Sequence, residues 1–209
     1  MILLSFEEWE PWYREIIAYF AFDPQKDEES AQILGGLTHR DDILLLHERC
    51  RGKTVTVCGN APSLRRELDC LRGVIFAADA AALVLYSNTI LPDAVFTDLD
   101  GATDEFCAMN EQGTIMVVHA HGDNIPLIRY WVSRFHGPVV ATTQGRPFSG
   151  VHNFGGFTDG DRAVFAAHAL GAQEVVLIGF DLDDPLVDPV KRGKLHWARR
   201  LLALLGHEL

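Results

Sequence analysis

The fold is decided at residues 94–101, Ala-Val-Phe-Thr-Asp-Leu-Asp-Gly. The apolar run 94–96 predicts a short buried strand, and two aspartates, Asp98 and Asp100, follow at its carboxyl end. Side chains alternate along a strand, so we expect both carboxylates on the same side of the backbone. In an open α/β sheet, ligands bind just beyond the carboxyl ends of the strands. The stretch therefore predicts a ligand site at one edge of a parallel sheet.

The two carboxylates also indicate which ligand this site would hold. Like charges so close repel each other unless a cation neutralises them or one carboxyl group keeps its proton. Magnesium is the cation that hard carboxylate oxygens commonly share with the phosphates of a substrate. Asp98 and Asp100 therefore predict a magnesium–phosphate site. A solvated turn is the alternative, because Asp and Gly are common turn residues.

On both sides of this stretch, from Lys53 onward, apolar runs alternate with segments of helical periodicity. The expected strands are 54–58, 74–79, 94–97, 115–118, 139–143 and 174–178. The expected helices are 64–71, 80–86, 103–110, 125–135, 158–170 and 191–204. This alternation predicts an α/β fold, with a doubly wound, mostly parallel Rossmann-like sheet of about six strands. Residues 144–157 are expected to form a loop.

Residues 1–51 have a different pattern, which predicts an N-terminal helical appendage. Ser5 and Glu8 form a capping box before an amphipathic helix, and 27–36 and 41–50 predict two more helices. We therefore divide the chain into an N-terminal helical segment, 1–51, and an α/β catalytic domain, 52–209, that includes the C-terminal helix.

Composition limits the partners and the location. A formal charge of −11 argues against a nucleic-acid surface, which needs a basic face, but leaves a nucleotide ligand possible because a bound metal reverses the local field. No apolar run reaches membrane length and no signal sequence precedes the first helix. The four cysteines lack CxxC spacing, as in reduced cytoplasmic proteins. We expect a cytoplasmic protein without membrane contact; assembly into a homo-oligomer stays open.

Polar residues collect after nearly every expected strand, so a parallel sheet would bring them to one rim. They are Gly59 to Ser63, Asp79, Asp98 with Asp100, His119 to Asp123, Thr143 with Gln144, and Asp181. Pro62 and Ser63 suit the first positions of a helix, where free backbone N–H groups attract phosphate. These residues predict one polar crevice.

Five motifs, in this order, resemble a known family. They are Gly-Asn-Ala-Pro-Ser at 59–63, Phe-Thr-Asp-Leu-Asp-Gly at 96–101, His-Ala-His-Gly-Asp-Asn at 119–124, Gly-Phe-Thr-Asp-Gly-Asp-Arg-Ala at 156–163 and Gly-Phe-Asp at 179–181. The set resembles the archaeal 6-hydroxymethyl-7,8-dihydropterin pyrophosphokinase family, the MptE-like proteins, and is more remotely similar to thiamine pyrophosphokinase catalytic domains. In the family the first turn is usually Gly-x-Gly-Pro-Ser; here Ala61 replaces its second glycine, where a methyl group restricts close approach of a phosphate.

The resemblance implies Mg2+-dependent transfer of diphosphate from ATP to the hydroxymethyl group of the reduced pterin, with release of AMP, in tetrahydromethanopterin- or folate-type pterin biosynthesis. Asp98 and Asp100 would hold the magnesium ion, with Asp79 or Asp123 as a further or water-mediated ligand, and the catalytic residues would be Asp98, Asp100, Asp181, Lys191 and Lys194. The nucleotide would contact Gly59, Asn60, Pro62, Ser63, His121, Asp123, Asn124 and Arg146. The pterin would contact Thr143, Gln144, Phe157 and Asp159.

Some of these roles stay open. Asp181 would either accept the proton of the substrate hydroxyl or bind the pterin. Of Asp159 and Asp161, we expect one to be a ligand and the other a helix cap.

Three other functions remain as alternatives. His119, His121 and Asp123 resemble the HxHxDH pattern of the metallo-β-lactamase fold, which would make the chain a metal-dependent phosphohydrolase, although Asn124 replaces the last histidine. Asp98 to Gly101 resembles the DxDGT loop of haloacid-dehalogenase-like phosphatases, with Ala102 in place of the threonine. A non-catalytic nucleotide-binding module is the third alternative.

Overall fold

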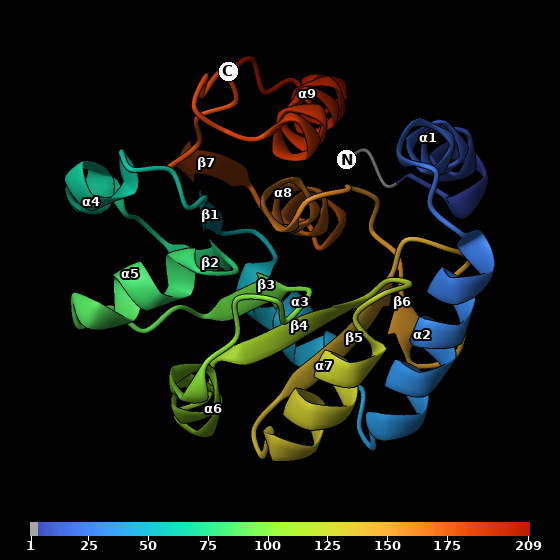
Figure 1. Ribbon diagram of the computed structural model, residues 1–209. Helices are drawn as coiled ribbons and strands as arrows, with labels where there is room; N and C mark the ends of the chain where they lie inside the picture. The colour runs from blue at the N-terminus through green and yellow to red at the C-terminus, as the bar shows by residue number, and fades with distance from the viewer. Residues whose placement is uncertain (1–3) are drawn as a thin grey trace.

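The computed structural model describes residues 4–209, and all of its strands belong to one parallel sheet (Figure 1). The strands are β1 (Thr54–Cys58), β2 (Val74–Ala78), β3 (Ala94–Thr97), β4 (Ile115–Ala120), β5 (Val139–Thr143), β6 (Val151–His152) and β7 (Glu174–Ile178). Their order across the sheet is β6-β5-β4-β3-β2-β1-β7. The predicted α/β class and the six expected strands are confirmed.

The seventh strand, β6, lies within the segment that was expected to be a loop. It pairs in parallel with β5, with Val151 opposite Ala141 and His152 opposite Thr142. Two residues are too few to show a period-two pattern, so periodicity could not identify this strand.

The helices follow the expected order with small shifts at their ends. They are α1 (Phe6–Phe20), α2 (Pro24–Leu37), α3 (Ile43–Cys50), α4 (Leu64–Glu67), α5 (Ala81–Ser87), α6 (Asp104–Glu111), α7 (Ile125–Trp131), α8 (Asp159–Ala169) and α9 (Pro189–Leu204). The capping box of Ser5 and Glu8 is present at the start of α1. Helix α2 begins earlier than expected, because Asp23 caps it and Pro24 occupies its first position.

Alternating strand residues pack on opposite faces of the sheet. In β3, Val95 belongs to the core beneath α2 and α4 to α7, whereas Ala94 and Phe96 belong to the core shared with α3 and α8. Figure 1 shows α8 on one side of the sheet and α5, α6 and α7 on the other. A third cluster, which includes Trp9 and Trp197, joins α1 and α9 to the outer side of α8. The sheet is therefore covered on both faces, as a doubly wound fold requires.

The connections bring every carboxyl end to the same edge of the sheet. The chain runs from β1 to β6 one strand at a time and then returns through α8 to place β7 beside β1. Helix α2 packs against β4, β5 and α7, so the N-terminal helical segment lies directly on the sheet; its division from the catalytic domain stays a prediction. Within residues 4–209, none of the helices has the length and apolar character needed to cross a bilayer.

Candidate active site

Three carboxylates meet at the carboxyl edge of the sheet, and we call them the acidic cluster (Asp79, Asp98 and Asp159). Asp79 follows β2, Asp98 follows β3 and Asp159 is the first residue of α8. One carboxylate oxygen from each lies within 4.8 Å of the others. Among residues 4–209, no other three His, Cys, Asp or Glu side chains bring their ligand atoms this close together. Asp79 and Asp98 were expected as metal ligands, whereas Asp159 was expected to contact the substrate.

Asp100 lies outside the acidic cluster. The side chains of Asp98 and Asp100 were expected to point to the same side of a strand, but the backbone after Thr97 is not strand-like. Strand β3 ends at Thr97, and Leu99 adopts a left-handed conformation with φ of 74° while its side chain is fully buried. The Asp100 N–H donates to Asp98 Oδ1 at 3.2 Å, and Asp100 is exposed. The two aspartates therefore form a tight turn, and the period-two expectation is wrong here.

A glycine allows this turn to approach Asp79 closely. A Cβ atom on Gly101 would collide with the Asp79 carboxylate, so a side chain at this position would displace it. Asp79 itself has a left-handed φ of 44°, and Thr97 Oγ1 donates to its Oδ1 at 2.7 Å. The glycine of the Asp-Leu-Asp-Gly motif thus shapes the acidic cluster without supplying a ligand.

The charges of the acidic cluster are incompletely balanced. Burial raises the pKa of Asp79, and the neighbouring charges of Asp98 and Asp100 raise it further. Burial and the charge of Asp98 raise the pKa of Asp159 well above its ordinary value. For Asp98, burial alone would raise the pKa, but the hydrogen bond from His121 and the charge of Arg162 lower it to about 2.

These features fit a divalent cation. The donor atoms are all carboxylate oxygens, which magnesium prefers. Two of the three carboxyl groups are held in a site that disfavours their charge, and an added positive charge would relieve this. Asp79, Asp98 and Asp159 are therefore the residues that could hold a magnesium ion.

Two basic side chains border the acidic cluster. Arg162, on α8, is 8% exposed and places Nη1 at 3.1 Å from Asp159 Oδ1. His121 places Nε2 at 3.4 Å from Asp98 Oδ2 and Nδ1 at 2.6 Å from Oδ1 of the exposed Asp123. Both groups stabilise negative charge at this edge of the sheet.

Asp161 has a different role from Asp159, although only Gly160 separates them. Its carboxylate accepts hydrogen bonds from the N–H groups of Phe157 and Thr158, at 2.8 and 2.6 Å, and from the Thr158 hydroxyl. It thereby closes a capping box at the start of α8. Asp161 is the cap of this pair, and Asp159 is left free to face the other carboxylates.

Asn124 ties the Asp98 turn to β4. Its side-chain amide donates to the carbonyls of Asp98, at 2.8 Å, and His119, at 2.7 Å. Its oxygen accepts from the His121 N–H and the Ser30 hydroxyl, both at 3.1 Å. Because these four bonds use the full capacity of a buried amide, Asn124 has no free group for the nucleotide contact that was expected.

A second buried polar group links the N-terminal helices to the same loops. The Asp27 carboxylate accepts from the Tyr13 hydroxyl at 2.7 Å, Gln144 Nε2 at 2.7 Å and the Gly122 N–H at 2.8 Å. Trp9 Nε1 donates to the Gln144 carbonyl at 2.8 Å. We call Tyr13, Asp27, Ser30, Asn124 and Gln144 the buried network. Asp27 could not be predicted from the sequence, because one acid in a helix gives no periodic signal.

The turn after β1 has few backbone donors left for a phosphate. The N–H groups of Gly59 and Ala61 donate to the carbonyls of Ile178 and Gly179, each at 2.9 Å. Proline at position 62 has no N–H group. Asn60 and Ser63 are the remaining donors of this turn. A Cβ atom on Gly59 would collide with the Gly179 carbonyl group, so the first glycine is needed for the close approach of β1 and β7.

The other predicted site residues lie in varied surroundings. Thr143 is buried and its hydroxyl accepts from the Gly145 N–H at 3.1 Å, and Phe157 is buried with its ring centroid 5.2 Å from that of Phe20. Asp181 is exposed and accepts from the Asp183 N–H at 3.1 Å.

The predicted basic contacts, Arg146, Lys191 and Lys194, have other surroundings. Arg146 pairs with Glu7 at 3.2 Å and lies 4.4 Å from the centroid of Phe6. Lys191 is exposed and Lys194 half-buried, both on α9. Across residues 4–209, none of these three forms an ion pair with the acidic cluster.

The chain is similar to a set of archaeal proteins. Residues 32–185 match the family model described as 6-hydroxymethylpterin diphosphokinase MptE-like. A curated protein of Methanothermobacter thermautotrophicus, named 6-hydroxymethyl-7,8-dihydropterin pyrophosphokinase, is 38% identical over 95% of this chain and 94% of its own length. Proteins of the same name from Pyrococcus furiosus and Methanocaldococcus jannaschii are 38% and 32% identical, over 85% and 99% of this chain and 78% and 98% of their own lengths.

Among solved structures, the MAf glycosyltransferase of Magnetospirillum magneticum AMB-1 matches 66% of this chain and 24% of its own chain, with a TM-score of 0.46 and 23% identity.

Proposed function

We propose a reaction for this chain, which belongs to the MptE-like family of 6-hydroxymethylpterin diphosphokinases. Its curated relatives are named as pyrophosphokinases, so the chain is an enzyme of this class. The proposed reaction moves the terminal diphosphate of ATP to the hydroxymethyl oxygen of 6-hydroxymethyl-7,8-dihydropterin and releases AMP. The product would feed tetrahydromethanopterin- or folate-type pterin biosynthesis.

The observation that carries this proposal is the acidic cluster at the carboxyl edge of the sheet. Asp79, Asp98 and Asp159 would hold Mg2+, which supplies positive charge against the triphosphate during transfer. Asp100 lies two residues after Asp98 and would assist from the exposed side of the turn. Without a cation, three acids so close together would have little reason to occupy a partly buried crevice.

The chain's own groups would position the phosphates. The N–H groups of Asn60 and Ser63 would donate to a phosphate oxygen at the end of β1, beside the exposed ring of Pro62. Arg162 and His121, held against the acidic cluster, would offset charge on the transferred group. Diphosphate transfer depends mainly on such positioning and charge neutralisation.

The remaining residues that were predicted for the site fall into two groups, those that reach solvent and those that are buried. Lys191, Lys194, Arg146 and Asp123 have polar ends that reach solvent and would contact the nucleotide, and Asp181 would contact the pterin or its hydroxyl. Thr143, Gln144, Asn124 and Phe157 are buried, so they would shape the walls of the site and hold its loops in place.

A metal-dependent phosphohydrolase is the second candidate, and it rests on His119 and His121. Their ring centroids lie 6.4 Å apart. His119 Nδ1 bonds to Thr142 Oγ1, whereas His121 lies between Asp98 and Asp123. The two rings therefore face different partners, and this arrangement favours the pyrophosphokinase over a two-histidine metal centre.

One assay tests the proposed reaction. Purified protein is mixed with Mg2+, ATP and 6-hydroxymethyl-7,8-dihydropterin, and nucleotides and pterins are separated and quantified. We expect AMP and a pterin diphosphate in equal amounts, and no AMP when the pterin is left out. Release of ADP or inorganic phosphate independent of the pterin would instead support the hydrolase, and ATP binding without turnover would support a non-catalytic nucleotide-binding module.

A further inference from the structure

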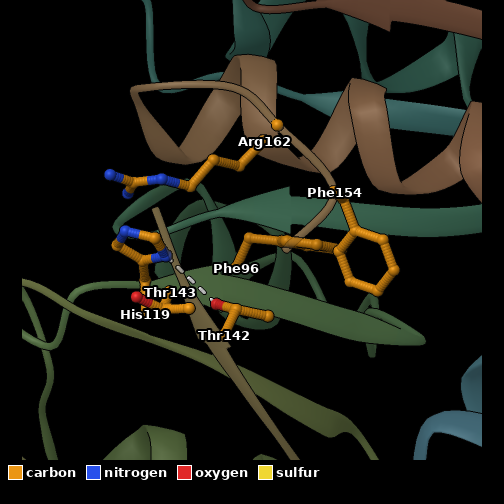
Figure 2. Close-up of a pocket in the computed structure, with 7 residues that line it drawn as sticks. Phe96, His119, Thr142, Thr143, Phe154 and Arg162 are labelled. Atoms are coloured by element: carbon orange, nitrogen blue, oxygen red, sulfur yellow. Dashed lines mark hydrogen bonds between the residues drawn. The ribbon is translucent and has the colours of Figure 1, made fainter. Parts of the chain in front are cut away.

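A small cavity lies next to the acidic cluster, on the side of Arg162 (Figure 2). Its volume is about 10 Å³, and its walls are Phe96, His119, Thr142, Thr143, Phe154, Gly155 and Arg162. Figure 2 shows the Arg162 side chain running over the His119 ring, with the Phe154 ring on the other side. A space of this size holds about one water-sized group.

The hydrogen bonds of Thr142 determine which nitrogen of His119 carries the proton. Thr142 Oγ1 donates its single proton to the Val118 carbonyl at 2.9 Å. Its contact with His119 Nδ1, at 3.1 Å, must therefore be one in which Nδ1–H donates. The neutral ring then has a bare lone pair on Nε2, and burial lowers the pKa of His119 well below its ordinary value, which keeps the ring neutral.

Two polar atoms beside this cavity have no partner. His119 Nε2 and Arg162 Nε are both buried without a hydrogen bond among the described residues, and the two residues are only 3% and 8% exposed. An unpaired buried polar atom costs free energy, and native structures seldom leave one unless a ligand or water satisfies it. The residues that line the cavity therefore include one unpaired acceptor, His119 Nε2, and one unpaired donor, Arg162 Nε–H.

We propose that this cavity binds the primary hydroxyl group of the acceptor substrate, with His119 as the general base in place of Asp181. A hydroxyl group is the size of one water molecule, donates one hydrogen bond and accepts another. It would donate to His119 Nε2 and accept from Arg162 Nε–H. The inference rests on the proposed diphosphate transfer, whose acceptor is a hydroxymethyl group.

The proposed step follows from this placement. As the hydroxyl oxygen forms its bond to the β-phosphorus of ATP, its proton moves to His119 Nε2. The bond between the β-phosphorus and the oxygen that bridges to the α-phosphorus breaks, and its electron pair stays on that oxygen, which leaves with AMP. Arg162 joins the two regions, because it lines the cavity while its Nη1 contacts Asp159.

Two variants of His119 separate proton transfer from hydrogen bonding. In H119N the amide can keep the bond to Thr142, but nothing remains at the position of Nε2. In H119Q the longer amide can place an oxygen near that position, although it cannot take up a proton at neutral pH. We expect kcat to fall about 10²- to 10⁴-fold in both variants. Binding of Mg-ATP, measured by calorimetry, should stay near the wild-type value.

A substrate analogue gives a readout that does not depend on turnover. Wild-type protein should bind 6-hydroxymethyl-7,8-dihydropterin about tenfold more tightly than 6-methyl-7,8-dihydropterin, which lacks the hydroxyl group. H119Q should retain this preference and H119N should lose it. A residue with only a structural role would weaken both pterins equally.

The outcomes separate this inference from the proposed function. If the wild type forms AMP with the pterin but H119N keeps kcat within about threefold, the general base is overturned and the diphosphate transfer stands. Equal affinity of the wild type for the two pterins would overturn the hydroxyl site, even if H119N failed to fold. A wild type that forms no AMP with the pterin would overturn the proposed function itself.

Discussion

The acidic cluster and the buried network both hold carboxylates away from bulk water, but they satisfy them differently. In the buried network, Asp27 is 3% exposed and receives three hydrogen bonds of 2.7 to 2.8 Å from its own chain. In the acidic cluster, Asp79 and Asp159 have raised pKa values because burial and neighbouring acids disfavour their charge. The difference indicates that hydrogen bonds within the folded chain satisfy Asp27, whereas the contacts of the acidic cluster leave the charges of its carboxylates incompletely balanced.

Asn124 joins these two regions. It bonds to Ser30 in α2 on one side and to the carbonyl of Asp98 on the other. The acidic cluster is thus anchored to the buried network, which fixes the position of the Asp98 turn.

The largest effect is expected when one carboxylate is removed from the acidic cluster. D98N should lower kcat by about 10³-fold or more, because the transferred charge loses several kcal/mol of stabilisation. It should also abolish the rise in melting temperature that Mg-ATP produces in the wild type. D100N is the matched control, and we expect a loss of about tenfold or less, because Asp100 lies outside the cluster. Equal losses of kcat in the two variants would indicate that Asp100 also contributes to the proposed metal site.

The next effect should come from the buried network, and it should appear as stability. D27A leaves the Tyr13 hydroxyl, Gln144 Nε2 and the Gly122 N–H without an acceptor. We expect the free energy of unfolding in urea to fall by about 3 kcal/mol or more, and by about 1 kcal/mol in Y13F, which removes a single donor. A loss in D27A no greater than in Y13F would show that Asp27 is not the centre of this network.

Much of the fold could be predicted from local pattern. The β-branched run Thr54 to Cys58 and the continuous apolar run Ile115 to Val118 identify buried strands because their side chains pack on both faces of the sheet. The helix at residues 6–20 follows from the capping box of Ser5. Strand β6 has only two residues and pairs with β5. A local sequence pattern does not indicate such a pairing.

The candidate site was less predictable because it depends on contacts between distant residues. Asp159 joins Asp98 across the first turn of α8, and nothing in the spacing of the two residues indicates this. Alternation misplaced Asp100, since the strand ends at Thr97 and Leu99 reverses the chain. The unpaired Nε2 of His119 becomes apparent only when the bonds of Thr142 are known.

A third region, the pair formed by His168 and His207, is expected to make the stability of the protein depend on pH. His168 Nε2 and His207 Nε2 lie 2.9 Å apart, so one ring donates to the other. Burial lowers the pKa of both, and the charge of His207 lowers that of His168 further. Below the ordinary value of 6.5 the unfolded chain binds more protons than the folded protein, so stability is complete above this pH and falls as the pH decreases.

Melting temperatures between about pH 7.5 and pH 5.5 test this contact. We expect the wild type to lose stability on acidification, and H207Q to lose less, because one of the two titrating groups is gone. A steeper loss in H207Q would mean that the pair is stabilised by a shared proton.

The smallest effect is expected at Arg146, which lies outside both the acidic cluster and the buried network. Its side chain is 64% exposed and pairs with Glu7. R146A should change the melting temperature by no more than about 2 °C, since an exposed ion pair contributes little. If Arg146 contacts ATP as proposed, KM for ATP should rise about two- to fivefold with kcat unchanged. An unchanged KM would remove Arg146 from the nucleotide site.

The position of β7 beside β1 has a consequence for synthesis on the ribosome. Thr54 pairs with Glu174, 120 residues later, so one edge of β1 has no partner strand until most of the chain has been synthesised. The carboxylate of Asp159 arrives nearly as late. A nascent chain therefore lacks part of the acidic cluster and exposes the edge of β1 until the final strand pairs there, and an exposed strand edge is prone to self-association.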